Sequence, residues 1–233
     1  MHLHETELII HTEHCSPKGE LRIASLLRIF QEIAISGVTV LGFPREDTIA
    51  RGLFWVIGKQ RLEITRLPRY GETIKVQTYP GKRVFHFFQR HTRLLDADGN
   101  VLVKGNALWA LVDIASRKVA DPAKLGFAIP EESMDGELPF PSSYPIPQGG
   151  EEKEIEARWG YCDLNGHLNN AAYLDGVEDL IPLSFLKDHT CTEIDITYKK
   201  EIPLGEKAKV TAVYEAPYWH FHGENVAIRL RYK

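Results

Sequence analysis

The chain has 233 residues, a formal net charge of -4 and a hydrophobic content of 43%. This length suits one large domain or two small ones, with enough apolar surface for a core. The charge balance, without a long Lys/Arg block, argues against nucleic acid as a partner. We judge the longest apolar stretches too short for the roughly 20 residues of a membrane span, and expect no membrane partner.

The N-terminal residues indicate where in the cell the protein is expected, and the cysteines indicate whether a disulfide or a metal site is expected. His2, His4 and Glu5 stand where a signal peptide needs basic and apolar runs, so we expect a cytoplasmic protein. Three cysteines without a CxxC spacing make a disulfide scaffold or a zinc site improbable on spacing alone. We therefore predict neither a metal nor another cofactor.

The predicted elements form two similar series. The first has a strand over 7–12, a helix with apolar residues at helical spacing from 21 to 34, and strands over 54–65, 73–78, 86–95 and 101–113. The second has a strand over 153–158, a helix over about 168–180, and strands over 193–199, 207–214, 218–222 and 226–232. A helix followed by antiparallel strands, repeated once, predicts α+β packing with one helix on each sheet.

A proline-rich segment separates the two series. Residues 121–150 contain six of the thirteen prolines, which remove backbone donors and exclude a helix or a central strand. We interpret this segment as an extended linker. The sequence thus predicts an N-terminal unit over 1–120, a linker over 121–150 and a C-terminal unit over 151–233.

Short matches in the same order indicate that the two units are copies of one another. A Gly-Glu pair opens a strand at Gly71 and again at Gly205, and a Cys-x-x-x-Gly frame recurs at Cys15 and Cys162. Each match is weak alone, but their common order favours an internal duplication.

Polar residues that suit chemistry gather in the second copy. Asp163, Asn165, His167 and Asn169 lie within seven residues at the start of a predicted helix, whereas a helix N-cap would explain only one of them. The first copy has Ser16, Lys18 and Glu20 at the matching places. Glu201 follows the next strand, where a solvated turn residue is the alternative interpretation. We expect the backbone N–H groups at the helix start to stabilise a developing oxyanion.

Asp-Leu-Asn-Gly-His-Leu-Asn-Asn (163–170), followed by Tyr-Lys-Lys-Glu (198–201), resembles the plant and bacterial acyl-(acyl carrier protein) thioesterases. Their pattern is D-x-N-x-H-x-N-N and a later Y-R-R-E-C, and residues 54–62 resemble the family's W-V-V-T-R-M-Q-I strand. The resemblance implies a double hotdog fold, hydrolysis of fatty acyl thioesters of acyl carrier protein, and a catalytic group composed of Asp163, Asn165, His167 and Glu201.

One departure from the family pattern bears on the mechanism. Ile202 stands where many plant members have a cysteine, so a thiol nucleophile is impossible at this position. We expect Glu201 to act as the general base on water, with His167 and Asn165 hydrogen-bonding the reacting groups and Asp163 fixing their arrangement. The division of roles among these residues stays open. Hydrolysis of acyl-CoA, a hotdog hydratase and a non-catalytic acyl-binding protein are the alternatives.

The acyl chain is expected to lie in an apolar tunnel beneath the first helix. We assign its walls to Leu26, Phe30, Ile33 and Trp55, and leave the preferred chain length open. A basic surface patch for the acidic carrier protein is a further hypothesis, formed by Lys82, Arg83, Arg90, Arg93, Arg117 and Lys118. Because two fused units already mimic a dimer of single units, either a monomer or a homodimer is compatible with the sequence.

Overall fold

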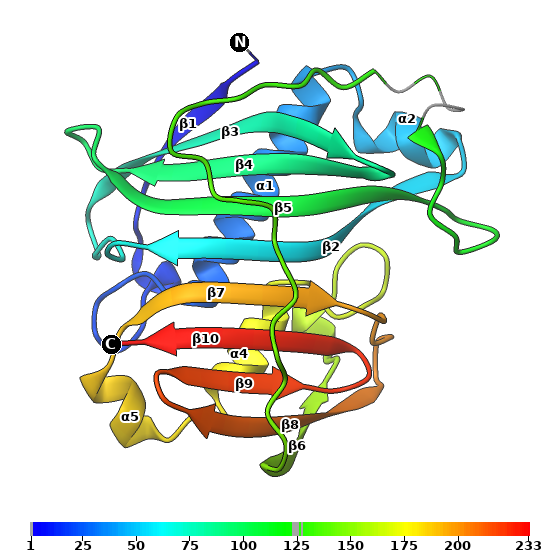
Figure 1. The fold of residues 1–233 in the computed structure, drawn as a ribbon. Helices are drawn as coiled ribbons and strands as arrows, with labels where there is room; N and C mark the ends of the chain where they lie inside the picture. The colour runs from blue at the N-terminus through cyan, green and yellow to red at the C-terminus, as the bar shows by residue number, and fades with distance from the viewer. Residues whose placement is uncertain (1, 123–125, 127) are drawn as a thin grey trace.

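A computed structural model of the chain describes residues 2–122, 126 and 128–233. Within these residues ten strands form one antiparallel sheet, with one long helix and one short helix on the same face (Figure 1). The strands are β1 (His4–Ile9), β2 (Leu53–Ile64), β3 (Thr73–Val84), β4 (Phe87–Leu95), β5 (Val101–Asp113), β6 (Glu151–Glu156), β7 (Cys191–Tyr198), β8 (Lys207–Glu215), β9 (Tyr218–His222) and β10 (Val226–Tyr232). The helices are α1 (Ile23–Val40), α2 (Arg45–Ala50), α4 (Ala172–Glu178) and α5 (Leu183–Asp188), with short 3-10 turns η1 (Thr12–His14) and η2 (Trp159–Tyr161).

The strand order shows the duplication directly. It reads β1-β3-β4-β5-β2 in the first unit and β7-β10-β9-β8-β6 in the second, so each strand has a counterpart at the mirrored place. The units meet where β2 pairs antiparallel with β7, from Lys59 opposite Thr197 to Glu63 opposite Glu193. The α+β double hotdog predicted from the sequence is confirmed by this arrangement.

Helix α1 packs closely against the sheet because two glycines make room for it. A Cβ on Gly37 of the helix would lie 2.9 Å from the Thr78 methyl on β3, and a Cβ on Gly105 of β5 would lie 2.9 Å from the Phe30 ring. The Phe30 ring therefore fills the space that Gly105 leaves on the sheet. Helix α1 extends to Val40, beyond the end predicted from its apolar spacing.

The judgement that every apolar stretch is too short for a membrane span is wrong for helix α1, which has that length and apolar composition, and half of this stretch is buried inside the fold. Within the described part of the chain it is the one helix that meets these criteria. Its buried face is accounted for by its contacts with the sheet, since a core helix has the same composition as a spanning one.

The second helix is shorter than its predicted range of about 168–180, and this prediction is wrong at its start. Leu168 instead pairs with Cys162, and its backbone N–H donates to the Ile202 carbonyl oxygen at 2.8 Å. The Asn169 side-chain oxygen then accepts the N–H of Ala171 at 2.9 Å, which turns the chain into α4. The polar residues of the second copy therefore lie on a loop and not at the helix start.

The proline-rich segment crosses the face of the sheet that α1 and α4 leave open (Figure 1). Its backbone is held there by Asn106 of β5, whose side-chain amide donates to the carbonyl oxygens of Leu138 at 3.1 Å and Pro139 at 3.3 Å. Farther along, the ring of Tyr144 lies 4.5 Å from the Arg229 guanidinium. The described part of this linker is thus irregular but packed, whereas residues 123–125 and 127 of the predicted linker lie outside the described residues.

Glu178 ends α4 with its carboxyl group in the protein interior, near the Cys191 thiol and the Tyr232 hydroxyl. Burial, assisted by the nearby Asp175 carboxylate, raises the pKa of Glu178 from 4.5 to about 8, and Arg22 opposes this shift only in part. Because folding favours the protonated form, the stability from this group is complete below the ordinary pKa. That stability is lost as the pH rises through about 8.

We predict that Glu178→Gln becomes progressively more stable than the wild type as the pH rises from about 5 to about 8, because glutamine stays neutral. Each unit by which the pKa is raised corresponds to about 1.4 kcal/mol in the free energy of unfolding, and this is an upper limit because Glu178 is partly exposed to water. Chemical denaturation at several pH values measures the difference. The exposed acid Glu7 is the control, since Glu7→Gln should follow the wild type at every pH; a Glu178→Gln curve parallel to the wild type would contradict the prediction.

Candidate functional site

The polar loop of the second copy, residues 162–168, is a tight β-like turn. Cys162 and Leu168 pair at its base, and the backbone N–H of Asp163 donates to the His167 carbonyl oxygen at 2.8 Å. Gly166 closes the turn with a φ of +77°, a left-handed conformation that glycine adopts without strain. Because of this turn, the side chains of Asp163, Asn165 and His167 project from one short segment.

The Asp163 carboxylate organises the loop from within. Its Oδ1 atom accepts the backbone N–H of Asn165 at 2.8 Å and that of His167 at 3.3 Å. Its Oδ2 atom accepts the side-chain amide of Asn165 at 3.3 Å. A carboxylate that accepts several N–H groups is a strong local anchor, so Asp163 fixes where Asn165 and His167 lie.

Glu201 comes from the segment after β7 and faces this loop. The Asn225 side-chain amide donates to the Glu201 carbonyl oxygen at 3.1 Å, which holds the backbone in place. The Nε2 atom of His167 then lies 3.5 Å from Oε2 of Glu201. Their side chains are 22% and 38% exposed, so both are open to water and to a ligand. The structure thus brings two sequence-predicted residues together from segments 34 positions apart.

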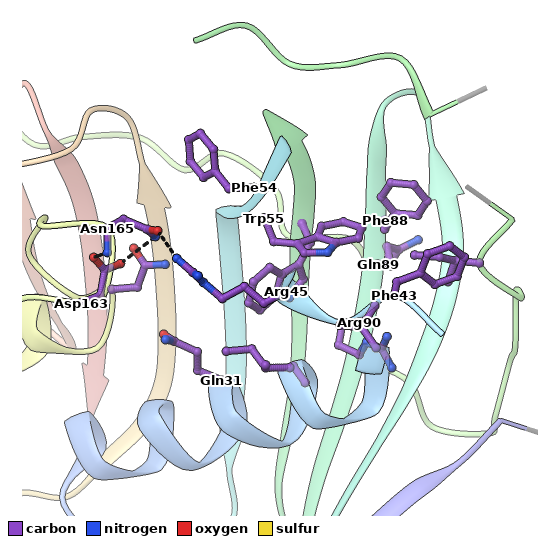
Figure 2. A pocket seen from close by; sticks show the side chains of 16 residues that line it. Gln31, Phe43, Arg45, Phe54, Trp55, Phe88, Gln89, Arg90, Asp163 and Asn165 are labelled. Atoms are coloured by element: carbon purple, nitrogen blue, oxygen red, sulfur yellow. Dashed lines mark hydrogen bonds between the residues drawn. The ribbon is translucent and has the colours of Figure 1, made fainter. Parts of the chain in front are cut away.

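Two arginines of the N-terminal unit complete the site, and sequence reasoning assigned neither to it. Arg45 of α2 donates to Oδ1 of Asn165 at 2.9 Å (Figure 2). Arg117, in the turn after β5, forms an ion pair with Oε2 of Glu201 and lies over the Phe54 ring at 5.0 Å. Its φ of +58° is unusual for a residue with a side chain. Nothing in the local sequence around Arg45 signals this role, because the contact spans 120 residues.

An apolar cavity opens beside the loop and runs along α1 (Figure 2). Its helix side is formed by one stripe of α1, and its sheet side by aromatic rings of β2, β4 and β5. Asp163, Asn165 and Asn170 stand at its mouth, whereas His167 and Glu201 lie just outside its lining. The Arg117 guanidinium links the two regions, since it contacts Glu201 and packs on Phe54, which lines the cavity.

The structure places the four predicted chain-binding residues in two different environments. Trp55 lines the cavity, but Leu26, Phe30 and Ile33 are buried in the main core. The cavity wall on the helix is instead a stripe at spacing 31, 34, 35 and 38, offset around the helix axis from these three residues. The cavity therefore lies beside the sheet-facing stripe of α1, because Phe30 occupies the space directly beneath it.

The hypothesis of one basic surface patch is wrong for its central members. Arg90 is only 6% exposed and lines the cavity, because it shares the inward face of β4 with Phe88. Arg93 points to the opposite face, where it donates to the Asp135 carbonyl oxygen of the linker at 2.6 Å. Arg117 is engaged by Glu201. Strand alternation thus places Arg90 and Arg93 on opposite faces of the sheet, and the ion pair with Glu201 separates Arg117 from both.

The described residues offer little for metal binding or for catalysis by a thiol. Among the described residues, no group of three or more His, Cys, Asp and Glu side chains is arranged to hold a metal ion. Cys162 is half-buried, and this burial, together with the Asp163 carboxylate, raises the pKa of its thiol. A raised thiol pKa disfavours the thiolate that a cysteine nucleophile needs.

The arrangement suits attack by water on a bound electrophile. A carboxylate paired with an imidazole can take a proton from water and return it to a leaving group. The adjacent apolar cavity can hold a hydrocarbon chain, with its reactive end at the polar mouth.

Both units of the chain match models of the same protein family. Residues 2–124 match the family model described as "Acyl-ACP thioesterase N-terminal domain", and residues 146–232 match "Acyl-ACP thioesterase C-terminal domain". The chain is 23% identical over 201 residues to acyl-(acyl-carrier-protein) hydrolase FATB2 of Cuphea viscosissima, which covers 77% of this chain and 47% of the relative. It is 24% identical over 225 residues to dodecanoyl-(acyl-carrier-protein) hydrolase of Cinnamomum camphora, at 84% and 55% coverage. The chain thus spans about half the length of these curated relatives.

Solved structures show the same fold. An acyl-ACP thioesterase from Bacteroides thetaiotaomicron superposes with a TM-score of 0.88 at 18% identity, covering 100% of this chain and 98% of the other. The 12:0-ACP thioesterase from Umbellularia californica superposes with a TM-score of 0.84 at 18% identity and the same coverage.

We predict that Asp163→Ala speeds amide hydrogen exchange at Asn165 and His167. The substitution removes the carboxylate that accepts both N–H groups, and a hydrogen bond to a charged group contributes about 1.5–3 kcal/mol, equivalent to at least about tenfold in local opening. Exchange followed by NMR or mass spectrometry measures the change. Ser16→Ala in the corresponding loop of the first unit is the control and should leave these two amides unaffected. Unchanged protection in Asp163→Ala would show that the turn holds without the carboxylate.

Proposed function

The chain belongs to the acyl-ACP thioesterase family, and we propose that it hydrolyses fatty acyl thioesters of acyl carrier protein by activating water. The observation that carries the proposal is the pairing of His167 with Glu201 next to the polar loop whose Asp163 and Asn165 line the mouth of an apolar cavity. An acyl chain in the cavity would bring its thioester carbonyl to these two side chains. Both belong to the motifs by which the sequence resembles the family.

Glu201 is the general base in this proposal. Arg117 and His167 both contact Oε2 of Glu201, so we assign the attacking water to Oε1. As the water oxygen bonds to the thioester carbon, its proton passes to the carboxylate and the carbonyl becomes an oxyanion. The ion pair with Arg117 holds the carboxylate toward the cavity mouth while this happens.

The second half of the reaction breaks the carbon–sulfur bond. When the tetrahedral intermediate collapses, the electron pair of that bond leaves with sulfur as a thiolate. The proton taken from water returns to this sulfur through the Glu201–His167 pair, giving a free fatty acid and the carrier thiol. Asn165, oriented by Asp163 and Arg45, is placed to hydrogen-bond the thioester carbonyl or the water.

This scheme needs no covalent intermediate. Ile202, which follows Glu201, is 2% exposed and packs in the main core, so this position offers no nucleophile. Cys162 is a poor alternative because its thiol pKa is raised.

We predict that Glu201→Gln lowers kcat/KM for an acyl carrier protein thioester by about 100- to 10,000-fold, the usual contribution of a general base. Glutamine keeps the shape and can still hydrogen-bond Arg117 and His167 weakly, so thermal unfolding should change little. Cys162→Ala is the matched control and should retain most activity. An active Glu201→Gln together with a folded but inactive Cys162→Ala would favour a covalent mechanism, and an acyl group trapped on Cys162 would establish it.

Exposed apolar side chains next to the site favour a protein carrier over CoA. Trp159, shortly before the loop that carries Asp163 and His167, is 84% exposed, and Leu164, within that loop, is 87% exposed. Large apolar side chains that are left in water beside a site are typical of protein contact surfaces.

We predict that Leu164→Ser raises KM for an acyl carrier protein thioester several-fold while kcat/KM for the matching acyl-CoA stays within twofold. The reason is that only the carrier protein is large enough to cover this side chain, and loss of a buried leucine contact is worth about 1–3 kcal/mol. Steady-state kinetics with both thioesters of one acyl chain provides the measurement. Leu183→Ser, an exposed leucine on α5, is the control. An equal loss on both thioesters would argue that Leu164 shapes the site itself.

A further inference from the structure

Arg90 is a buried cation at the end of the cavity away from the polar loop (Figure 2). Its side chain comes from the inward face of β4 and the residue is 6% exposed. Throughout the residues that the structure describes, its guanidinium forms neither a hydrogen bond nor an ion pair with another side chain or with the backbone. A buried guanidinium has five N–H donors and ordinarily has hydrogen-bond acceptors for them. The absence of acceptors around Arg90 therefore needs an explanation.

A second donor without a partner belongs to a residue that lines the same cavity. The indole Nε1 of Trp109 is buried and has no hydrogen-bond partner among the described atoms. In the ladder of β4 with β5, Phe88 lies opposite Trp109 and Arg90 lies opposite Ala107. Trp109 and Arg90 are therefore diagonal neighbours on one face of the sheet, at a separation that long side chains can bridge. Both line the cavity.

The charge on Arg90 persists in this environment. Burial lowers the pKa of Arg90 to about 10, so the guanidinium is still protonated at neutral pH. A Cβ on Gly37 would lie 3.3 Å from a guanidinium nitrogen of Arg90, which places the group against the last turns of α1. The carbonyl end of a helix attracts a cation, and this accounts for a charge being tolerated there. It does not satisfy the donors, which still lack acceptors.

The rest of the cavity is suited to a hydrocarbon chain. Its walls between the mouth and Arg90 include Ala34, Ile35, Val38 and Phe88. The helix wall runs from Gln31 to Val38, about 10 Å at the rise of an α-helix. A ligand that fills this space therefore meets a largely apolar wall between the polar mouth, where Gln31 and Asn165 lie, and the donor groups at the far end.

We propose that the far end of the cavity binds an oxygen atom on the distal end of the acyl chain, a hydroxyl or a carboxylate, through Arg90 and Trp109. The preferred substrates are then medium-chain acyl thioesters that are oxygenated at the end remote from the thioester. This inference rests on the proposed function, which it deepens by naming the substrate class. A charge-assisted hydrogen bond to such an oxygen supplies the acceptor that the folded protein lacks.

The test compares three thioesters of acyl carrier protein that have the same chain length: octanoyl, ω-hydroxyoctanoyl and ω-carboxyheptanoyl. We expect the wild type to show a kcat/KM at least about tenfold higher for one or both oxygenated chains than for octanoyl, the usual discrimination by a hydrogen bond to a charged group. The two oxygenated substrates distinguish a neutral from an anionic chain end. Arg90→Met, which keeps the length without the charge, should reverse the order and favour octanoyl.

Arg93→Met is the matched control, because it is the same substitution on the same strand but on the opposite face. It should keep the wild-type order of substrates. A readout without turnover is the shift in melting temperature on addition of ω-hydroxyoctanoic or suberic acid, which should stabilise the wild type and not Arg90→Met. Arg90→Met should itself melt no lower than the wild type, since it removes a buried unpaired charge.

The outcomes separate this inference from the proposed function. Equal hydrolysis of the three thioesters, or a preference for octanoyl that Arg90→Met leaves unchanged, would overturn the inference and leave the thioesterase intact. Hydrolysis of none of them or of any other acyl carrier protein thioester, with Glu201→Gln indistinguishable from the wild type, would overturn the proposed function. In that case, stabilisation by the free acids would still report on the Arg90 site.

Discussion

The antiparallel pairing of β2 with β7 is the constraint on which the rest of the site depends. It joins two five-stranded halves into one sheet and puts the end of the N-terminal unit next to the polar loop of the C-terminal unit. Only in this arrangement can Arg45 reach Asn165 and Arg117 reach Glu201. Each unit alone would bury one helix on one sheet, but neither would contain both the polar loop and the cavity beside α1. The arrangement of the candidate site is thus a property of the pair.

The two copies of one fold have diverged at equivalent positions in a way that physical contacts explain. In the first copy the Ser16 hydroxyl accepts the Lys18 N–H at 3.3 Å, so the turn is kept by a neutral side chain. The Lys18 ammonium then donates to the His189 carbonyl oxygen at 2.8 Å and ties the first loop to the second unit. In the second copy the same turn is kept by the Asp163 carboxylate, which leaves Asn165 and His167 to face Arg45 and Glu201. One loop therefore fastens the units together and the other presents reactive groups.

The cavity shows how a small residue on a strand decides where a ligand can go. Because Gly105 has no side chain, the Phe30 ring packs directly against the sheet at this position. The ring fills the space beneath the centre of α1. The remaining space lies to one side, between the stripe that includes Ala34 and the aromatic rings of the sheet. Its walls are apolar, its mouth is polar and its far end carries a cation. A linear ligand with chemistry at one end, and an oxygen at the other, matches this distribution of polarity.

The sequence by itself determined the duplication, the order of the strands and the polar motifs of the second copy. These depend on local patterns: alternation along strands, prolines that exclude regular structure in the linker, and a departure of one copy from the other at matched positions. It also singled out His167 and Glu201 as candidates, because the first copy has Glu20 in place of the imidazole and no acid in place of Glu201. The tertiary structure alone decided that Arg45 and Arg117 belong to the site, that Phe30 fills the core and Trp55 the cavity wall, and that Arg90 points inward. The two arginine contacts span many tens of residues and leave no local signal in the chain. Helical spacing and strand alternation separate the faces of an element, but only the packing decides which face meets the core and which meets the cavity.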